Sequence, residues 1–207
     1  MLVSAEVRWF WRNECPRQVH DWFFRSGLPP GGGRPRIDRY LPQPNNAELG
    51  IKERGDIAGL EIKGLVATRT SPALAKLASH LEIWCKWSCV VPDLSLTAAV
   101  TLTKTRWLRQ FDASKTVRLE IPFDADEKSK SDYALHPQGC NVELTEVRGP
   151  SRIDVWWTLG FEAFDGLDAA SVSLLRTILP EEAKVTENAS SGELLSYPAW
   201  LLAKQTR

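Results

Sequence analysis

The feature that most constrains the fold is a regular alternation of polar and apolar residues in nine segments of the chain. Alternation with period two is typical of a β-strand that has one polar and one apolar face. Most of the segments are separated by short turns, which favours antiparallel neighbours over a βαβ arrangement. The segments span residues 3–11, 36–40, 48–54, 60–66, 80–90, 98–109, 116–121, 141–147 and 153–164.

Charged residues lie two or four positions apart on one face of these strands. The pairs are Lys52 with Arg54, Glu61 with Lys63, Glu82 with Lys86, Lys104 with Arg106, and Arg118 with Glu120. One interpretation is a solvated outer face over an apolar core, as in a β-sandwich. The alternative is a barrel with the charges inside and the apolar faces outside, under helices.

Two observations favour the barrel. Exposed strand faces are commonly rich in Ser, Thr and Lys, whereas here both signs of charge recur on almost every strand. Helices expected at 16–27, 71–79 and 168–179 need an apolar surface, and a Ser190–Glu193 capping box predicts a further terminal helix. Segment 28–35, with its Pro-Pro-Gly-Gly-Gly run, is expected to be a loop, and 124–136 a polar excursion. We therefore expect an α+β fold: a closed antiparallel β-barrel of about eight strands with flanking helices.

Length and composition limit the function. The 207 residues contain no linker long enough to divide them, so we expect one domain over 1–207. The net charge is zero, which argues against a nucleic-acid partner. No apolar run is long enough for a membrane span, and the start does not resemble a signal peptide, so we expect a cytoplasmic protein. The four cysteines are expected to be buried, reduced thiols, with a metal site or a disulfide as the alternatives.

Charges inside a barrel need partners, because desolvating an isolated ion costs several kcal/mol. Lysine and arginine are the usual contacts for phosphate. Carboxylates on the same face would either neutralise these bases or hold a Mg²⁺ or Mn²⁺ that bridges to phosphate oxygens. The pattern therefore indicates a phosphorylated small-molecule anion as the partner.

Several fragments, in this order, resemble the CYTH superfamily, the triphosphate tunnel metalloenzymes. They are Asp38 to Pro42, Glu48 to Arg54, Leu60 to Gly64, Lys104 to Arg106, Asn141 to Leu144, Leu159 to Glu162, and Ser196 to Leu202. The resemblance implies a tunnel of eight antiparallel strands that holds a triphosphate with a divalent metal. Members hydrolyse inorganic triphosphate or thiamine triphosphate, cap RNA or cyclise ATP.

The resemblance also implies roles for particular residues. The family's first strand carries Glu-x-Glu-x-Lys, where this chain has Ser4-x-Glu6-x-Arg8, and Gly160 stands where a second carboxylate is expected. Catalytic residues and ligands of Mg or Mn would then be Glu6, Glu143 and Glu162. The residues that would contact phosphate are Arg8, Lys52, Arg54, Lys63, Lys104 and Arg106.

Three classes of function remain open from the sequence. The first is a metal-dependent triphosphatase, and the second a non-catalytic receptor for a phosphometabolite or polyphosphate, which the missing carboxylates at Ser4 and Gly160 favour. The third is a barrel for an apolar ligand, or a plain interaction domain, in which Trp84, Trp107 and Trp156 would form an aromatic pocket. We expect a monomer or homodimer with no nucleic-acid or membrane partner.

Overall fold

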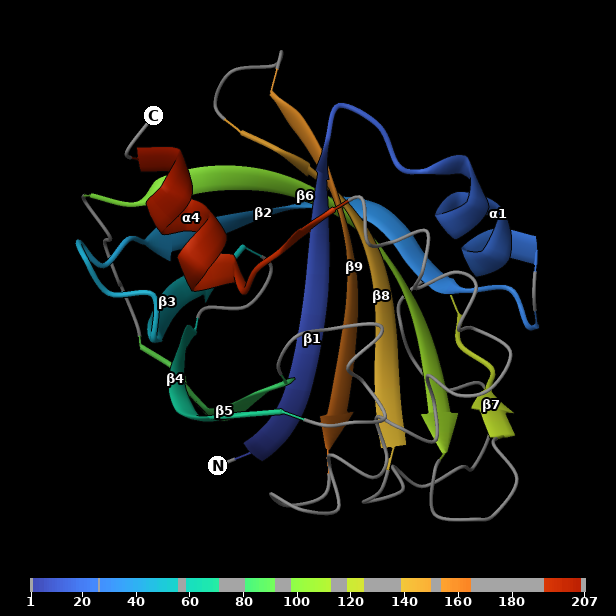
Figure 1. Cartoon of the computed structure of the whole chain (residues 1–207), viewed down its shortest axis with the longest axis horizontal. Helices are drawn as coiled ribbons and strands as arrows, with labels where there is room; N and C mark the ends of the chain where they lie inside the picture. Colours follow the sequence, from blue (N-terminus) through green and yellow to red (C-terminus); the bar gives the residue numbers. More distant parts are fainter. Residues whose placement is uncertain are drawn as a thin grey trace.

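The first long strand of the chain pairs with the last, and this pairing closes the sheet into a barrel (Figure 1). The computed structural model describes residues 2–25, 27–55, 59–70, 81–91, 98–112, 119–124, 139–149, 154–164 and 192–205. β1 (Leu2–Arg12) and β9 (Val155–Phe164) are antiparallel neighbours, with Glu6 opposite Glu162 and Arg8 opposite Gly160.

The ring of strands runs β1, β5, β4, β3, β2, β6, β8, β9 and back to β1, and every pair is antiparallel. The closed antiparallel barrel of eight strands expected from the sequence is therefore confirmed. The remaining strands of the ring are β2 (Gly31–Leu41), β3 (Leu49–Arg54), β4 (Leu60–Arg69), β5 (Leu81–Cys89), β6 (Val100–Asp112) and β8 (Gly139–Arg148).

Two short strands and two helices complete the described part of the chain. β7 (Leu119–Ile121) pairs with β6 outside the ring, and β10 (Glu193–Leu194) pairs with β1 beside Trp9 and Phe10. The helices are α1 (Arg17–Arg25) and α4 (Tyr197–Gln205). These residues are thus mostly β rather than α+β. The helices expected at 71–79 and 168–179, and nearly all of segment 124–136, lie outside the described residues.

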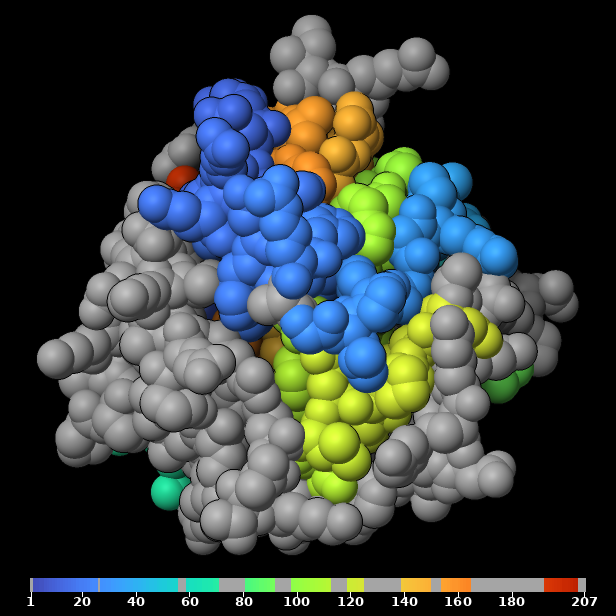
Figure 2. All heavy atoms as spheres, turned by 90° about the vertical axis from the view of Figure 1, so that its right-hand side faces the viewer, coloured from blue at the N-terminus to red at the C-terminus, as the bar shows by residue number. Residues whose placement is uncertain are grey.

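The apolar faces of β1, β8 and β9 point out of the barrel and pack under α1. Val7 and Trp9 of β1 and Phe161 of β9 belong to one buried cluster with Val19 and Phe23 of α1. Figure 2 shows α1 lying on the outside of the molecule, next to the light-blue start of β2. Burial of apolar surface outside the ring leaves the polar face of the same strands inside. None of the helices that the structure describes is long and apolar enough to cross a membrane.

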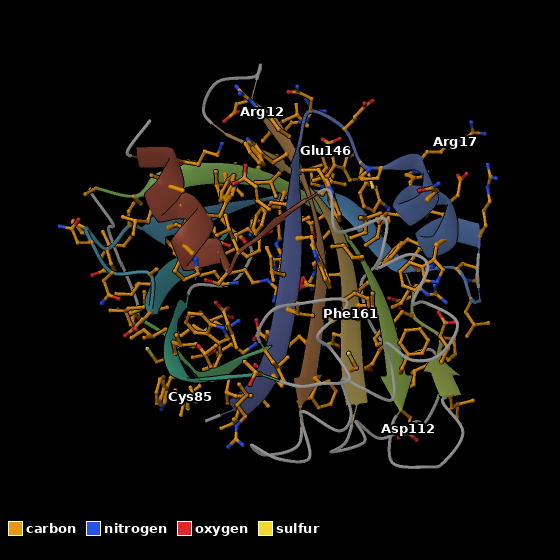
Figure 3. The ribbon with its side chains drawn as sticks, in the orientation of Figure 1. Arg12, Arg17, Cys85, Asp112, Glu146 and Phe161 are labelled. Atoms are coloured by element: carbon orange, nitrogen blue, oxygen red, sulfur yellow. The ribbon has the colours of Figure 1, made fainter. Side chains whose placement is uncertain are left out.

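Helix α4 covers one end of the barrel interior. Trp200 and Leu201 pack with Phe10, Tyr40 and Trp156 in a second buried cluster. In Figure 3, Arg12 and Glu146 lie at this end of the strands and Asp112 at the opposite end. The helix begins after Ser196, whose hydroxyl accepts a hydrogen bond from the Ala199 N–H at 3.4 Å. The expected Ser190–Glu193 capping box is wrong, because Glu193 lies in β10.

The glycine-rich segment expected as a loop is also different in the structure. Gly31 to Pro35 form the first half of β2, opposite Leu108 to Thr105 of β6. Gly32 and Gly33 have φ values of 92° and 87°, and the register shifts between Gly32 and Pro35. Glycine adopts this positive φ readily, so the strand continues through a bulge where other residues would end it.

One residue predicted to share the polar face, Glu120, lies outside the ring instead. Glu120 of β7 accepts hydrogen bonds from Arg109 at 2.7 and 2.8 Å, and the guanidinium stacks over Trp22 and Phe23 of α1. The ion pair therefore fastens α1 to the barrel wall. Arg118 is outside the described residues.

Candidate functional site

The residues that the sequence singles out line one cavity inside the barrel. Its volume is about 130 Å³, and α4 forms part of its wall through Tyr197, Pro198 and Leu201. Inward-facing Lys104 and Arg106 argue against an apolar-ligand barrel. All the predicted positions are present in the lining: Glu6, Arg8, Lys52, Arg54, Lys63, Lys104, Arg106, Glu143 and Glu162.

Arg8 lies across the inner surface of β9 and β8. Its guanidinium donates to the Thr158 hydroxyl at 2.7 Å and to Glu143 Oε1 at 2.9 Å. A Cβ atom at Gly160 would be 2.3 to 2.6 Å from three guanidinium atoms of Arg8. A side chain at position 160 would overlap the guanidinium where it lies in the structure, so Gly160 and the position of Arg8 are structurally coupled.

Glu143 is shared between two arginines. Its second oxygen, Oε2, accepts a hydrogen bond from Arg106 at 3.3 Å. Burial acts to raise the pKa of Glu143, but the charges of Arg8 and Arg106 outweigh burial and hold this pKa well below its usual range. Burial acts to lower the pKa of Arg8, but Glu143, Tyr197 and Glu6 together outweigh burial and raise it. Arg8 and Glu143 are therefore charged at neutral pH.

Glu6 is bound on both carboxylate oxygens as well. The Ser4 hydroxyl donates to Oε1 at 2.6 Å, and Lys63 donates to Oε2. Lys63 also lies over the ring of Trp84, 5.2 Å from the centroid, and the Trp84 indole N–H donates to Glu82. Trp84 therefore supports the charged residues of the cavity wall instead of forming an aromatic pocket.

Two further lysines line the wall, Lys52 on β3 and Lys86 on β5. Lys52 forms an ion pair with Glu61 at 2.8 Å, and Lys86 with Glu162 at 3.6 Å. Glu162 and, in part, Glu61 raise the pKa of Lys86 against the effect of burial. Burial acts to raise the pKa of Glu61, but Lys52 and Lys86 lower it.

Lys104 packs against the rings of two tyrosines. Its ammonium group is 3.5 Å from the ring centroid of Tyr197 and 4.7 Å from that of Tyr40, and it donates to the Tyr40 hydroxyl. The side chain is only 4% exposed, and Asp38 is 3.7 Å away. Burial lowers the pKa of Lys104 well below its usual value; Asp38 opposes this shift, whereas Lys52 and Arg36 add to it. Burial raises the pKa of Tyr197 to about 12, so the tyrosine stays neutral.

Two polar groups beside these bases have no hydrogen-bond partner among the described residues. Thr145 lines the cavity, is 1% exposed, and its hydroxyl is unsatisfied. Arg36 Nε lies 3.2 Å from Asp38 Oδ1, but neither atom makes a hydrogen bond of good geometry. Buried polar groups are normally satisfied, so the Thr145 hydroxyl and the Arg36 Nε–H are positions where a ligand oxygen would gain a hydrogen bond.

Several cavity residues were not among the predicted contacts. Arg36 and Tyr40 line the cavity and alternate along β2 with Asp38, which lies behind the lining, so the signal was present in the sequence. Glu61, Glu82 and Lys86 were recognised as sharing the polar face without being assigned to the site. Tyr197 comes from α4, and strand alternation does not predict that this helix lies over the end of the barrel.

The carboxylates do not fit a divalent metal centre. Mg²⁺ and Mn²⁺ prefer several convergent oxygen ligands. Glu143 bonds to two arginines, Glu6 bonds to Ser4 and Lys63, and Glu162 pairs with Lys86. Within the described ranges, no three His, Cys, Asp or Glu side chains are grouped closely enough to hold a metal ion. As arranged here, the three carboxylates neutralise bases.

Comparison with known proteins adds no family assignment. The sequence matches no model of a protein family and no curated protein. What the cavity does must be inferred from its geometry and charge.

Proposed function

We propose that this protein binds a phosphorylated small-molecule anion inside its barrel, as a CYTH-like receptor that acts without metal-assisted hydrolysis. The observation that carries the proposal is the excess of bases in the cavity. Among the described lining residues, eight are basic and five are acidic, and Asp38 behind Arg36 and Lys104 is a sixth acid. Buried positive charge without a counter-ion is costly, so an anion in the cavity stabilises the folded state.

The kinds of side chain present support phosphate as the anion. Arg8, Arg36 and Arg106 supply planar forks, which bind phosphate oxygens through paired hydrogen bonds. The unsatisfied Thr145 hydroxyl lies opposite Arg106 in the β6–β8 register and adds a neutral donor. A phosphate group offers several strong acceptor oxygens, which matches this set of donors.

Hydrolysis is the competing function, and its requirements are less well supported. Metal-assisted attack on phosphorus needs carboxylates free to bind the ion and activate water. Each predicted ligand here is committed to a serine or a base. We therefore expect no phosphate release from tripolyphosphate with Mg²⁺ or Mn²⁺. If the wild type releases phosphate and Glu162→Gln does not, the protein is a triphosphatase and the proposal of a non-catalytic receptor is wrong.

Replacing Arg106 tests the binding proposal. Arg106→Gln is expected to weaken inorganic phosphate binding by roughly 10- to 100-fold, because a hydrogen bond to a charged group is worth about 1.5–3 kcal/mol. Isothermal titration calorimetry at fixed ionic strength measures the affinity. The matched control is Arg148→Gln, which removes an arginine whose side chain is 48% exposed and paired with Glu146. Equal phosphate affinities of Arg106→Gln and Arg148→Gln would show that the cavity is not the binding site.

Anion binding is also expected to take up a proton at Lys104. The pKa of Lys104 is well below its ordinary value in the free protein, and a bound anion raises it. Binding should therefore consume protons at a pH between the free and bound pKa values, and affinity should rise as pH falls through that range. Calorimetry in two buffers of different ionisation enthalpy measures the uptake. Uptake that persists in Lys104→Met would assign the proton to another group.

A further inference from the structure

We infer that the cavity binds its anion without a divalent metal, and that it suits a phosphate monoester dianion better than a metal-chelated triphosphate. The inference rests on the proposed function and defines the class of ligand more narrowly. It follows from two features of the cavity: the position of the Arg8 guanidinium over Gly160, and the surplus of positive charge among the lining residues.

The Arg8 guanidinium occupies the inner surface at Gly160. It is held there by Thr158 and Glu143, and its side chain is 10% exposed. Arg8 also lies 4.8 Å from the ring centroid of Tyr197, so α4 packs against the other side of it. Arg8 therefore places a fixed positive charge in the cavity wall. No metal ion from solution is needed to supply that charge.

Every oxygen of the carboxylates nearest to Arg8 already accepts a hydrogen bond. Both oxygens of Glu143 accept from arginines, and both oxygens of Glu6 accept from Ser4 and Lys63. A divalent metal would have to share these oxygens with bases that repel it, or displace those bases. The bases themselves therefore act as the counter-charges of the anion.

The size of the charge surplus limits the charge of the ligand. Eight bases face six acids when Asp38 is included, which leaves two positive charges among the described residues once Lys104 has taken up its proton in the anion-bound state. A phosphate monoester above its second pKa, which is about 6, carries close to two negative charges and would neutralise this surplus. A tripolyphosphate carries several more, and the excess would stay buried without a counter-ion unless a metal entered with it.

The experiment measures binding of three anions to the wild-type protein at pH 8 and constant ionic strength. The anions are inorganic phosphate, glycerol 2-phosphate and tripolyphosphate, each titrated calorimetrically with EDTA and again with Mg²⁺. We expect the two phosphate dianions to bind with affinities that differ by less than about twofold between EDTA and Mg²⁺. We expect tripolyphosphate to bind no more tightly than phosphate in either buffer, because its extra negative charge exceeds the positive surplus of the cavity.

The outcomes separate this inference from the proposed function. Phosphate binding that appears only with Mg²⁺, or is tightened more than about twofold by it, overturns metal independence and leaves anion binding intact. Tripolyphosphate binding that is tighter than phosphate binding in either buffer overturns the charge matching. If none of the three anions binds in either buffer, the proposed function itself fails.

Discussion

Glu143→Gln is expected to lower the free energy of unfolding by about 3–5 kcal/mol, because it leaves two buried guanidinium groups without their carboxylate. Arg8 and Arg106 bond to the two oxygens of Glu143 and are 10% and 17% exposed. The same change should tighten phosphate binding, since an anion would then be the nearest group able to neutralise the arginines. Stability without ligand and affinity for ligand should move in opposite directions.

Urea denaturation and calorimetric titration measure the two effects in Glu143→Gln. The matched control is Glu162→Gln. Among the described residues, the carboxylate of Glu162 forms an ion pair with Lys86 alone, at 3.6 Å, so its removal should lower the free energy of unfolding by less. The low folded-state pKa of Glu143 means that its contribution is present above the unfolded pKa and is lost as pH falls through the folded one. The variant should therefore lose less stability on acidification. A loss of both stability and affinity would assign Glu143 a direct role in the ligand site.

Gly160→Ala is expected to destabilise the protein by about 3 kcal/mol by displacing Arg8 from Glu143 and Thr158. The new methyl group would overlap the guanidinium, and the arginine would lose its charged and neutral partners together. Phosphate binding should weaken as well, since Arg8 would no longer hold its position in the cavity. Thermal and urea unfolding measure the stability change.

A double-mutant cycle separates this mechanism from a general intolerance of side chains in the barrel. In an Arg8→Ala background the clash is absent, so adding Gly160→Ala should cost less than about 1 kcal/mol and the coupling energy should reach about 2 kcal/mol. Gly64→Ala is the matched control, because a Cβ there meets only Trp87, at 3.7 Å. Additive effects of the Arg8 and Gly160 substitutions would show that the two positions are independent.

Much of the barrel could be predicted from strand alternation. The rule that residues i and i+2 share a face placed pairs such as Lys52 with Arg54 and Lys104 with Arg106 on one surface, and closure of the sheet turned that surface inward. The resemblance to a known family then selected the nine predicted site residues. Apolar residues such as Trp9 and Phe161 point outward because α1 provides their cover. The packing of a helix on the outer face of a sheet depends on contacts between distant parts of the sequence. The apolar faces of the expected helices nevertheless indicated it.

Other features depend on contacts that alternation does not encode. The direction of the Arg8 side chain is set by Thr158 and Glu143, which are far away in the sequence, and the absence of a side chain at Gly160 is informative only beside Arg8. The glycine-rich start of β2 was assigned to a loop because local propensity is weak evidence where a neighbouring strand supplies the hydrogen bonds. For the same reason the two-residue strand β10 was missed.

The pairing of β1 with β9 also determines when during protein synthesis the barrel can close. Phe164 must leave the ribosome before Ser4 gains its neighbour in β9, roughly 10–30 s after Ser4 itself at typical bacterial to eukaryotic elongation rates. Until then the bases and acids of β1 to β6 remain in water, where their charges carry no desolvation cost. Dehydration of the charged lining is therefore a late step, and the nascent chain keeps one hydrated, soluble face for most of its time on the ribosome.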